Sequence, residues 1–259
     1  MRIKAPFTTP AATLALLPAL LLGAAGCSSG ASGSSGADAA GKAPAPRGSA
    51  SASAPAPSGV PAVSAAPKAK DSRLEASALA QGDLAGYQVS AQGKNPNAPK
   101  GQPRADKKAC QPLADIMGDK PDPAARETVD RGIGSERHPG LAVSATVSSY
   151  AEADAKQVLS RLRAAVAACG QGFDATIGKQ TGSYRDVRAV PYKTAGDESV
   201  SWTTTASGQG VSAKVHLVVV RKGSTVVRLM ALQVADVDKQ ALVPQELADK
   251  QLEKISKAG

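Results

Sequence analysis

One low-complexity segment confines any folded domain of this chain to the residues that follow it. Between residues 28 and 67, 35 of the 40 residues are Ala, Ser, Gly or Pro. This composition offers too little apolar side-chain surface to offset the entropy lost on folding, so we expect residues 27–70 to form a disordered tether. Periodic hydrophobic patterns begin only after the tether. The sequence therefore predicts a single folded domain over residues 71–259.

The first 26 residues have the layout of a bacterial signal peptide. Arg2 and Lys4 precede an apolar run at 11–22, which is too short to cross a bilayer. Residues 24–27 (Ala-Ala-Gly-Cys) resemble a lipobox, although Leu is more usual at the first of these positions. In that motif the Cys thiol receives a diacylglyceryl group, and two acyl chains hold a protein stably on a membrane. We expect Cys27 to anchor the chain to the outer face of the cell membrane; an ordinary signal peptide is the alternative.

Helical periodicity is strongest between residues 150 and 169. Small and aliphatic residues recur there at helical spacing, and Ser149 stands three residues before Glu152, as in a capping box. Two further helices are expected at 107–117 and 244–257, because apolar residues at helical spacing recur in both segments.

Apolar runs separated by short turns predict antiparallel strands. The expected strands are 141–149, 185–192, 199–205, 211–221 and 225–234. Residues 217–220 and 226–227 are apolar on both faces, so we expect their two strands to be central and covered on both sides. The predicted fold class is α+β, an antiparallel sheet of about five to six strands packed with two to three helices.

The cysteines fit an exported domain. With Cys27 assigned to the lipid anchor, Cys110 and Cys169 remain, and such a pair outside the cytoplasm is most simply one disulfide. The bridge would close a loop of about 60 residues and stabilise the domain by roughly 4 kcal/mol in the chain-entropy relation. Two free buried thiols are the alternative. Redox catalysis is not expected, because the sequence has no Cys-x-x-Cys motif.

Several short blocks of the domain resemble a known family. The blocks are 79–89 (LAQGDLAGYQV), 148–155 (SSYAEADA), 168–173 (ACGQGF), 196–202 (GDESVSW) and 218–224 (VVVRKGS). They resemble surface lipoproteins of high-GC Gram-positive bacteria and, more loosely, the extracellular sensor domain of mycobacterial PknH-type receptor kinases. The resemblance implies an antiparallel sheet with helices around a polar, ligand-binding cleft. The PknH-type domain carries two disulfides, whereas this chain has Cys for one; receptor signalling is not implied, because no kinase signature is present.

Residues able to catalyse a reaction are scattered in the sequence. His138 lies in a polar loop and His216 on an expected strand, and no carboxylates cluster with them, so a zinc site is not predicted. Ser199 follows an acidic turn without the Gly-x-Ser-x-Gly elbow of a nucleophile, and residues 132–134 lack the dinucleotide fingerprint. We expect no enzymatic activity and no cofactor or metal. A hydrolase built around His138 or His216 is the alternative.

Basic residues outnumber acidic ones. Removal of residues 1–26 leaves 29 Lys and Arg against 22 Asp and Glu, a net charge of +7. A local basic run is formed by Lys100, Arg104, Lys107 and Lys108. Attraction to anionic lipids or wall polymers is one interpretation of this charge, and simple solubility is the other. Nucleic acid is not an expected partner, because aromatic residues are sparse and the chain is exported.

Aromatic and guanidinium side chains are the best candidates for ligand contacts. They suit a sugar, a phosphate or a carboxylate, and they are Trp202, Tyr184, Tyr192, Tyr150, Arg185 and Arg188. Trp202 is the only Trp, and core packing is an equal interpretation of it. The expected function is a membrane-anchored, non-enzymatic ligand-binding or sensor-like module for an anionic wall polymer, sugar or lipid. The alternatives are a structural protein that docks to an envelope partner, and a lipid or lipoglycan carrier.

Overall fold

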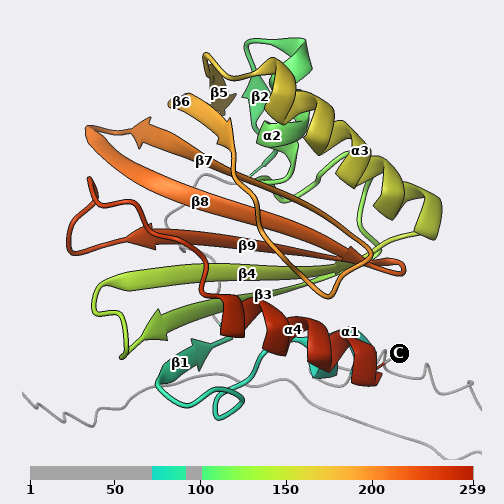
Figure 1. Cartoon of the computed structure of the whole chain (residues 1–259). Helices are drawn as coiled ribbons and strands as arrows, with labels where there is room; N and C mark the ends of the chain where they lie inside the picture. The colour runs from blue at the N-terminus through green and yellow to red at the C-terminus, as the bar shows by residue number, and fades with distance from the viewer. Residues whose placement is uncertain (1–71, 92–100, 259) are drawn as a thin grey trace, which may run out of the picture. The chain divides into compact units, whose positions relative to one another are not determined.

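A computed structural model of the chain describes residues 72–91 and 101–258 (Figure 1). The expected signal peptide, Cys27, the tether and Lys100 lie outside the described residues. Among the residues that are described, no helix is both long and apolar enough to cross a membrane.

The described residues form one antiparallel sheet of nine strands in the order β1-β3-β4-β9-β8-β7-β6-β5-β2 (Figure 1). Short hairpins join β3 to β4, β5 to β6, β7 to β8 and β8 to β9, which requires antiparallel pairing of these neighbours. The strands are β1 Tyr87–Ser90, β2 Arg104–Ala105, β3 Glu127–Ser135, β4 Leu141–Ser149, β5 Phe173–Ile177, β6 Gln180–Ala189, β7 Glu198–Gly208, β8 Val211–Lys222 and β9 Thr225–Gln233.

Four α helices accompany the sheet in the described part of the chain: α1 Arg73–Ser77, α2 Gln111–Asp115, α3 Glu152–Ala168 and α4 Gln245–Ala258. A 3₁₀ turn, Lys108–Cys110, leads into α2. The predicted fold class is therefore wrong: the molecule is mostly one large sheet of nine strands with four helices. The five expected strands correspond to β4, β6, β7, β8 and β9. Strands β1, β2, β3 and β5 had no clear apolar alternation to mark them.

The predicted capping box at the start of α3 does not form. Ala151 is the N-cap residue, and no side chain accepts a hydrogen bond from the first turn. Glu152 and Asp154 lie in that turn, where their negative charges interact favourably with the helix dipole.

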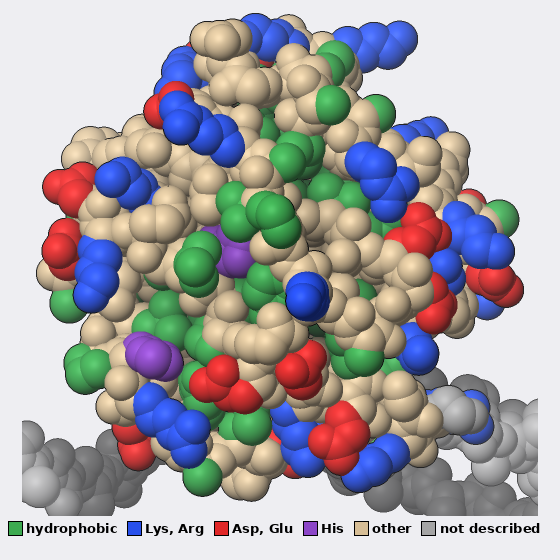
Figure 2. Space-filling view, viewed as in Figure 1, with side chains coloured by type: hydrophobic (Ala, Val, Ile, Leu, Met, Phe, Trp, Pro, Cys, Tyr) green, Lys and Arg blue, Asp and Glu red, His purple; other side chains and the backbone are tan. Residues whose placement is uncertain are grey.

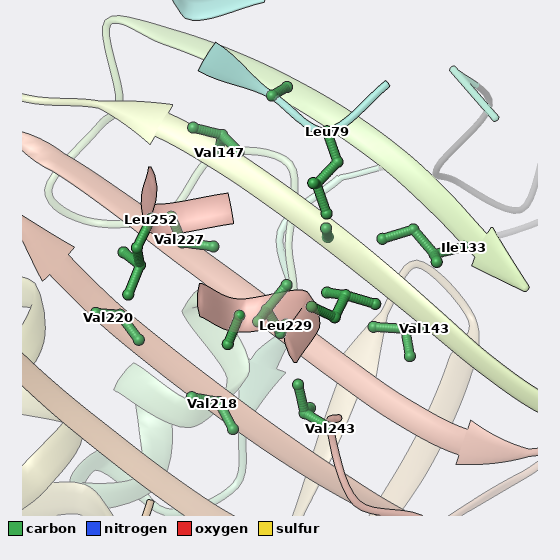
Figure 3. Close-up of a cluster of buried hydrophobic side chains, with 14 of the residues drawn as sticks. Leu79, Ile133, Val143, Val147, Val218, Val220, Val227, Leu229, Val243 and Leu252 are labelled. Atoms are coloured by element: carbon green, nitrogen blue, oxygen red, sulfur yellow. The ribbon is translucent and has the colours of Figure 1, made fainter. Parts of the chain in front are cut away.

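The two faces of the sheet carry separate hydrophobic cores. One core lies beneath α1 and α4, and includes Leu79, Val143, Val218 and Leu229 (Figure 3). The other lies beneath α2 and α3, and its larger apolar side chains include Leu159, Leu162, Phe173, Trp202, Leu217 and Val219. Alternate residues of β8 thus enter opposite cores, which agrees with the expectation that this strand is central and covered on both sides.

The predicted disulfide is present. Cys110 and Cys169 are bonded, 59 residues apart in sequence, and both are almost completely buried. The bridge ties the turn before α2 to the residue that caps the C-terminal end of α3. It therefore fixes the two helices that cover the second core.

Candidate functional site

The pairing of β6 with β7 stops before the start of β7. The register runs from Ser183 opposite Ser207 to Ala189 opposite Trp202. One further hydrogen bond, from the Val190 N–H to the Ser201 carbonyl at 3.0 Å, ends the contact. The first residues of β7, from Glu198 to Ser201, consequently lie beyond the end of β6.

The segment that joins β6 to β7, residues 190–197, crosses over the face of the sheet instead of following its edge (Figure 1). Gly196 lies so close to β8 that a Cβ atom on it would be 2.2 Å from Val220 Cγ1. The Tyr192 hydroxyl donates to the carbonyls of Val243 and Pro244, at 3.4 and 3.3 Å, and Gln245 donates to the Lys193 carbonyl at 2.9 Å. These contacts hold residues 190–197, hereafter the crossing segment, against the chain that leads into α4.

A groove of about 710 Å³ lies where the crossing segment leaves the edge of β7. One wall is the C-terminal half of α3, the other is the end of β6 with the start of the crossing segment, and the base is Ser199–Ser201. Most of the lining side chains are apolar, namely Val166, Ala167, Val187, Ala189, Val190, Pro191, Tyr192 and Val200. On the face of the sheet that the crossing segment covers, Figure 2 shows hydrophobic side chains gathered across the middle, with charged side chains mostly around them.

Backbone polar groups of β7 face this groove. In an antiparallel ladder, hydrogen bonds on one side of a strand come from every second residue. Because the Ser201 carbonyl accepts a hydrogen bond from Val190, which directly follows β6, the N–H and carbonyl of Ser199 point the same way, away from β8. No backbone partner on that side is present for Ser199 within the described residues. The base of the groove is therefore a short stretch of open strand edge.

A serine and a histidine meet beneath the groove. Ser201 Oγ lies 2.8 Å from His216 Nε2, and the backbone N–H of Val243 donates to His216 Nδ1 at 2.9 Å. Since Nδ1 accepts, the neutral ring carries its proton on Nε2 and donates that proton to Ser201. Burial lowers the pKa of His216 to about 4, so the ring is neutral at pH 7.

This arrangement does not activate Ser201 as a nucleophile. A catalytic base must accept the serine proton at Nε2 while an acidic group orients Nδ1. Here Nε2 is the donor, and Nδ1 is held by a backbone amide instead of a carboxylate.

Arg163 supplies a positive charge at the rim of the groove. Its side chain is 57% exposed, and its contact with Glu198 is long, at 3.5 Å. Glu198 is bound more closely by the buried guanidinium of Arg221, at 3.0 Å, and Arg221 also bonds Asp197 at 3.0 Å. Hydrogen bonding from the Gly223 N–H, together with Arg221, lowers the pKa of Asp197. Arg163 is thus the more loosely held of the two cations.

Of the six residues predicted to contact a ligand, Tyr192 lines the groove. Trp202 and Tyr150 are buried in the core beneath α3, each 2% exposed. Tyr184 stacks on Phe173 with ring centroids 4.9 Å apart. The other two side chains pair with acidic neighbours, Arg185 with Asp174 at 2.6 Å and Arg188 with Asp186 at 3.5 Å.

The sequence reasoning missed Arg163, Ser201 and the apolar side chains of α3 as lining residues. One signal was available: Pro191 interrupts the expected strand at 185–192, and Pro cannot donate to a ladder. Lys107 of the predicted basic run donates to the Gly172 carbonyl at 2.6 Å, which gives it a structural contact.

Metal ligands do not cluster in the described part of the chain: no group of three or more His, Cys, Asp or Glu side chains there could hold an ion. His138 is exposed, and its backbone N–H donates to Ser135 Oγ at 3.0 Å.

Fold and groove together define a single-sheet module with helices on both faces and an open strand edge in its groove. No protein-family model matches the chain, and no curated protein matches it. Among solved structures, the chain is similar to the extracellular domain of PknH from Mycobacterium tuberculosis, at 12% identity and a TM-score of 0.43. The match covers 72% of this chain and 94% of that domain. A putative uncharacterized protein from Mycobacterium smegmatis matches at 12% identity and a TM-score of 0.38, over 68% of this chain and 90% of that one.

Proposed function

We propose that this protein is a lipid-anchored, extracytoplasmic and non-enzymatic ligand-binding module, whose ligand site is the groove at the start of β7. The observation that carries the proposal is the groove itself. Its volume of about 710 Å³ lies in the range of small-molecule sites, roughly 300–1,000 Å³. It combines apolar walls with a few polar groups at the base and one cation at the rim, which is typical of such sites.

The N-terminal sequence and the disulfide support an extracytoplasmic position. The signal-peptide pattern ends at Cys27 in a lipobox-like motif. Disulfides persist in oxidising compartments, and the Cys110–Cys169 bridge fits a domain that is exported.

A groove-filling substitution tests the ligand site. Ala167 lines the groove and is exposed, so Ala167→Leu adds apolar volume there without entering the core. Ala153→Leu is the matched control, because Ala153 is also an exposed Ala of α3 but does not line the groove. The mature full-length protein in lipid nanodiscs is titrated with soluble wall fragments, a fluorescent fatty acid and short peptides.

The proposal expects saturable binding of one ligand class, weakened about tenfold or more by Ala167→Leu and unaffected by Ala153→Leu. Such a loss corresponds to about 1.4 kcal/mol of binding free energy. Binding of none of the probes, or binding that Ala167→Leu leaves intact, would contradict it.

A lipid carrier is the second candidate, because the walls of the groove are mostly apolar. A carrier would bind the fatty acid in preference to the other probes. The groove volume suits one small ligand and is too small for an entire lipoglycan.

A further inference from the structure

We propose that the groove takes an extended peptide, which adds to the open edge of β7 as a short strand and places an acidic group beside Arg163. This inference rests on the proposed function, since it names the ligand class of the same groove. Three features of the groove support it: the direction of the backbone groups, the alternation of the side chains, and the charge at the rim.

The backbone of β7 supplies the pattern that a strand recognises. The N–H and carbonyl of Ser199 face the groove, and so does the N–H of Ser201, for which no backbone acceptor is present in the described residues. Ser201 is only 7% exposed and Ser199 is half-buried, so these backbone groups are partly shielded from water. Leaving backbone groups unpaired away from water is unfavourable, and a peptide backbone satisfies both donors and acceptors at strand spacing.

The side chains around this edge alternate in the way that a strand requires. Val200 points to the core beneath α3, whereas Ser201 points to the opposite face, where it meets His216. A peptide that continued the line of β6 past Val190 would therefore direct alternate side chains towards α3 and towards the crossing segment. Both of these walls are apolar, formed by Val166 and Ala167 on one side and by Pro191 and Tyr192 on the other.

The length of the open edge and the charge beside it specify which peptides should bind. The open edge runs from Glu198 to Ser201, so about three or four ligand residues fit at roughly 3.4 Å per residue. Arg163 can pair with a carboxylate on such a peptide, because its own contact with Glu198 is long and exposed. We therefore expect a short apolar peptide that ends in a carboxylate or carries Asp or Glu.

Lipid and sugar ligands fit this edge less well. An acyl chain would fill the apolar walls but leave the backbone groups of Ser199 without partners. A sugar would bond those groups but bury little apolar surface against α3.

The test removes one of the two groove-facing backbone donors without touching the pairing with β8. Ser199→Pro deletes one N–H, and that N–H points away from β8, so proline is tolerated as on an edge strand. Ser199→Ala keeps the N–H and removes only the hydroxyl. The probes are N-acetylated tetrapeptides with apolar residues at alternate positions and a free C-terminal carboxylate. The same peptides are also made with alternate backbone amides N-methylated, or with an amidated C-terminus.

The inference predicts saturable binding of the unmodified peptides to the full-length protein in nanodiscs. N-methylation should abolish that binding, and Ser199→Pro should weaken it roughly tenfold, clearly more than Ser199→Ala. Arg163→Gln should remove the preference for the free carboxylate over the amide. Thermal unfolding of each variant shows whether it remains folded.

Three contrary results have different meanings. If the fatty acid binds in a manner sensitive to Ala167→Leu, while the peptides do not bind, the ligand-binding function stands and the peptide inference is overturned. If peptides bind equally well to the wild-type protein and to folded Ser199→Pro, strand addition is overturned. If no probe binds in a manner sensitive to Ala167→Leu, the proposed function itself fails.

Discussion

The Nδ1 atom of His216 accepts a hydrogen bond from the backbone N–H of Val243, 2.9 Å away. His216 lies on β8, and Val243 lies in the chain that leads into α4. Tyr192 packs against the His216 ring with centroids 5.8 Å apart and bonds the Val243 carbonyl. The neutral imidazole therefore joins the sheet, the crossing segment and the approach to α4.

Acid should weaken the fold through this histidine. Because the pKa of His216 is lowered from 6.5 to about 4 in the folded protein, the unfolded chain binds a proton first as the pH falls. The neutral His216 therefore contributes fully to the free energy of unfolding above pH 6.5. This contribution, about 3 kcal/mol, is lost progressively as the pH falls towards 4.

Urea unfolding at pH 7, 5.5 and 4.5 measures this effect. A His216→Gln variant should be less stable at pH 7 and should lose less stability over the same interval. Equal pH dependence in the variant and the wild type would show that His216 is not responsible. Carboxylates with a lowered pKa, such as Asp197, contribute mainly at lower pH.

Loss of the disulfide should destabilise the domain strongly. The bridge joins residues 59 apart, for which the chain-entropy relation gives roughly 4 kcal/mol. Cys110→Ala combined with Cys169→Ala, which leaves no unpaired thiol from the bridge, should lower Tm by several degrees or more. Differential scanning calorimetry of the variant and of the wild type, each with and without reductant, is the measurement. Reductant should lower the Tm of the wild type and leave that of the variant unchanged. A variant that melts at the same temperature as the oxidised wild type would contradict the prediction.

Gly196 should tolerate no larger side chain. A Cβ atom there would lie 2.2 Å from Val220 Cγ1 and 2.9 Å from the Arg221 carbonyl, so Gly196→Ala must move the crossing segment. We expect a loss of about 1–3 kcal/mol in the free energy of unfolding. Gly134→Ala is the control, since a Cβ atom at Gly134 meets nothing within 4 Å. If Gly196→Ala were as stable as Gly134→Ala, the crossing segment could not lie this close to β8.

The lipid anchor is tested by Cys27→Ser. If the lipobox-like motif is used, the substitution removes the acylated thiol, and the protein is released into the medium or remains as an unprocessed precursor. Cell fractionation with mass spectrometry of the N-terminal peptide distinguishes these fates. A Cys27→Ser protein that is processed and retained on the membrane as the wild type is would rule out the anchor.

Parts of this fold were predictable because they depend on local pattern. Residues 217–220 are apolar on both faces, and this alone indicated a central strand, as β8 is. In contrast, β3 contains Gly132, Gly134 and several charged residues, and pairing with β4 makes it a strand. The two-residue strand β2 likewise depends on its partner β5.

The groove could not be predicted, because it depends on where the chain after β6 stops pairing with β7. Ser199 and Ser201 resemble ordinary strand residues in the sequence, and their backbone is exposed only because the chain turns away from β7 after Val190. Trp202 has polar neighbours in sequence, which suggested a ligand platform, yet it lies in the core beneath α3. Residue type alone favours aromatic and Arg side chains as ligand contacts, whereas the site is made mainly by aliphatic walls and backbone groups.

The start of β7 is an open strand edge, and amide hydrogen exchange tests this without any knowledge of the ligand. By the register with β8, the N–H of Val200 is bonded to β8, whereas those of Ser199 and Ser201 face the groove. In the free protein, residue-resolved NMR should therefore show fast exchange at Ser199 and Ser201 and slow exchange at Val200 and at Thr203, which pairs with Arg188 of β6. Uniformly slow exchange from Ser199 to Thr203 would contradict the account, because it would mean that this edge is already paired.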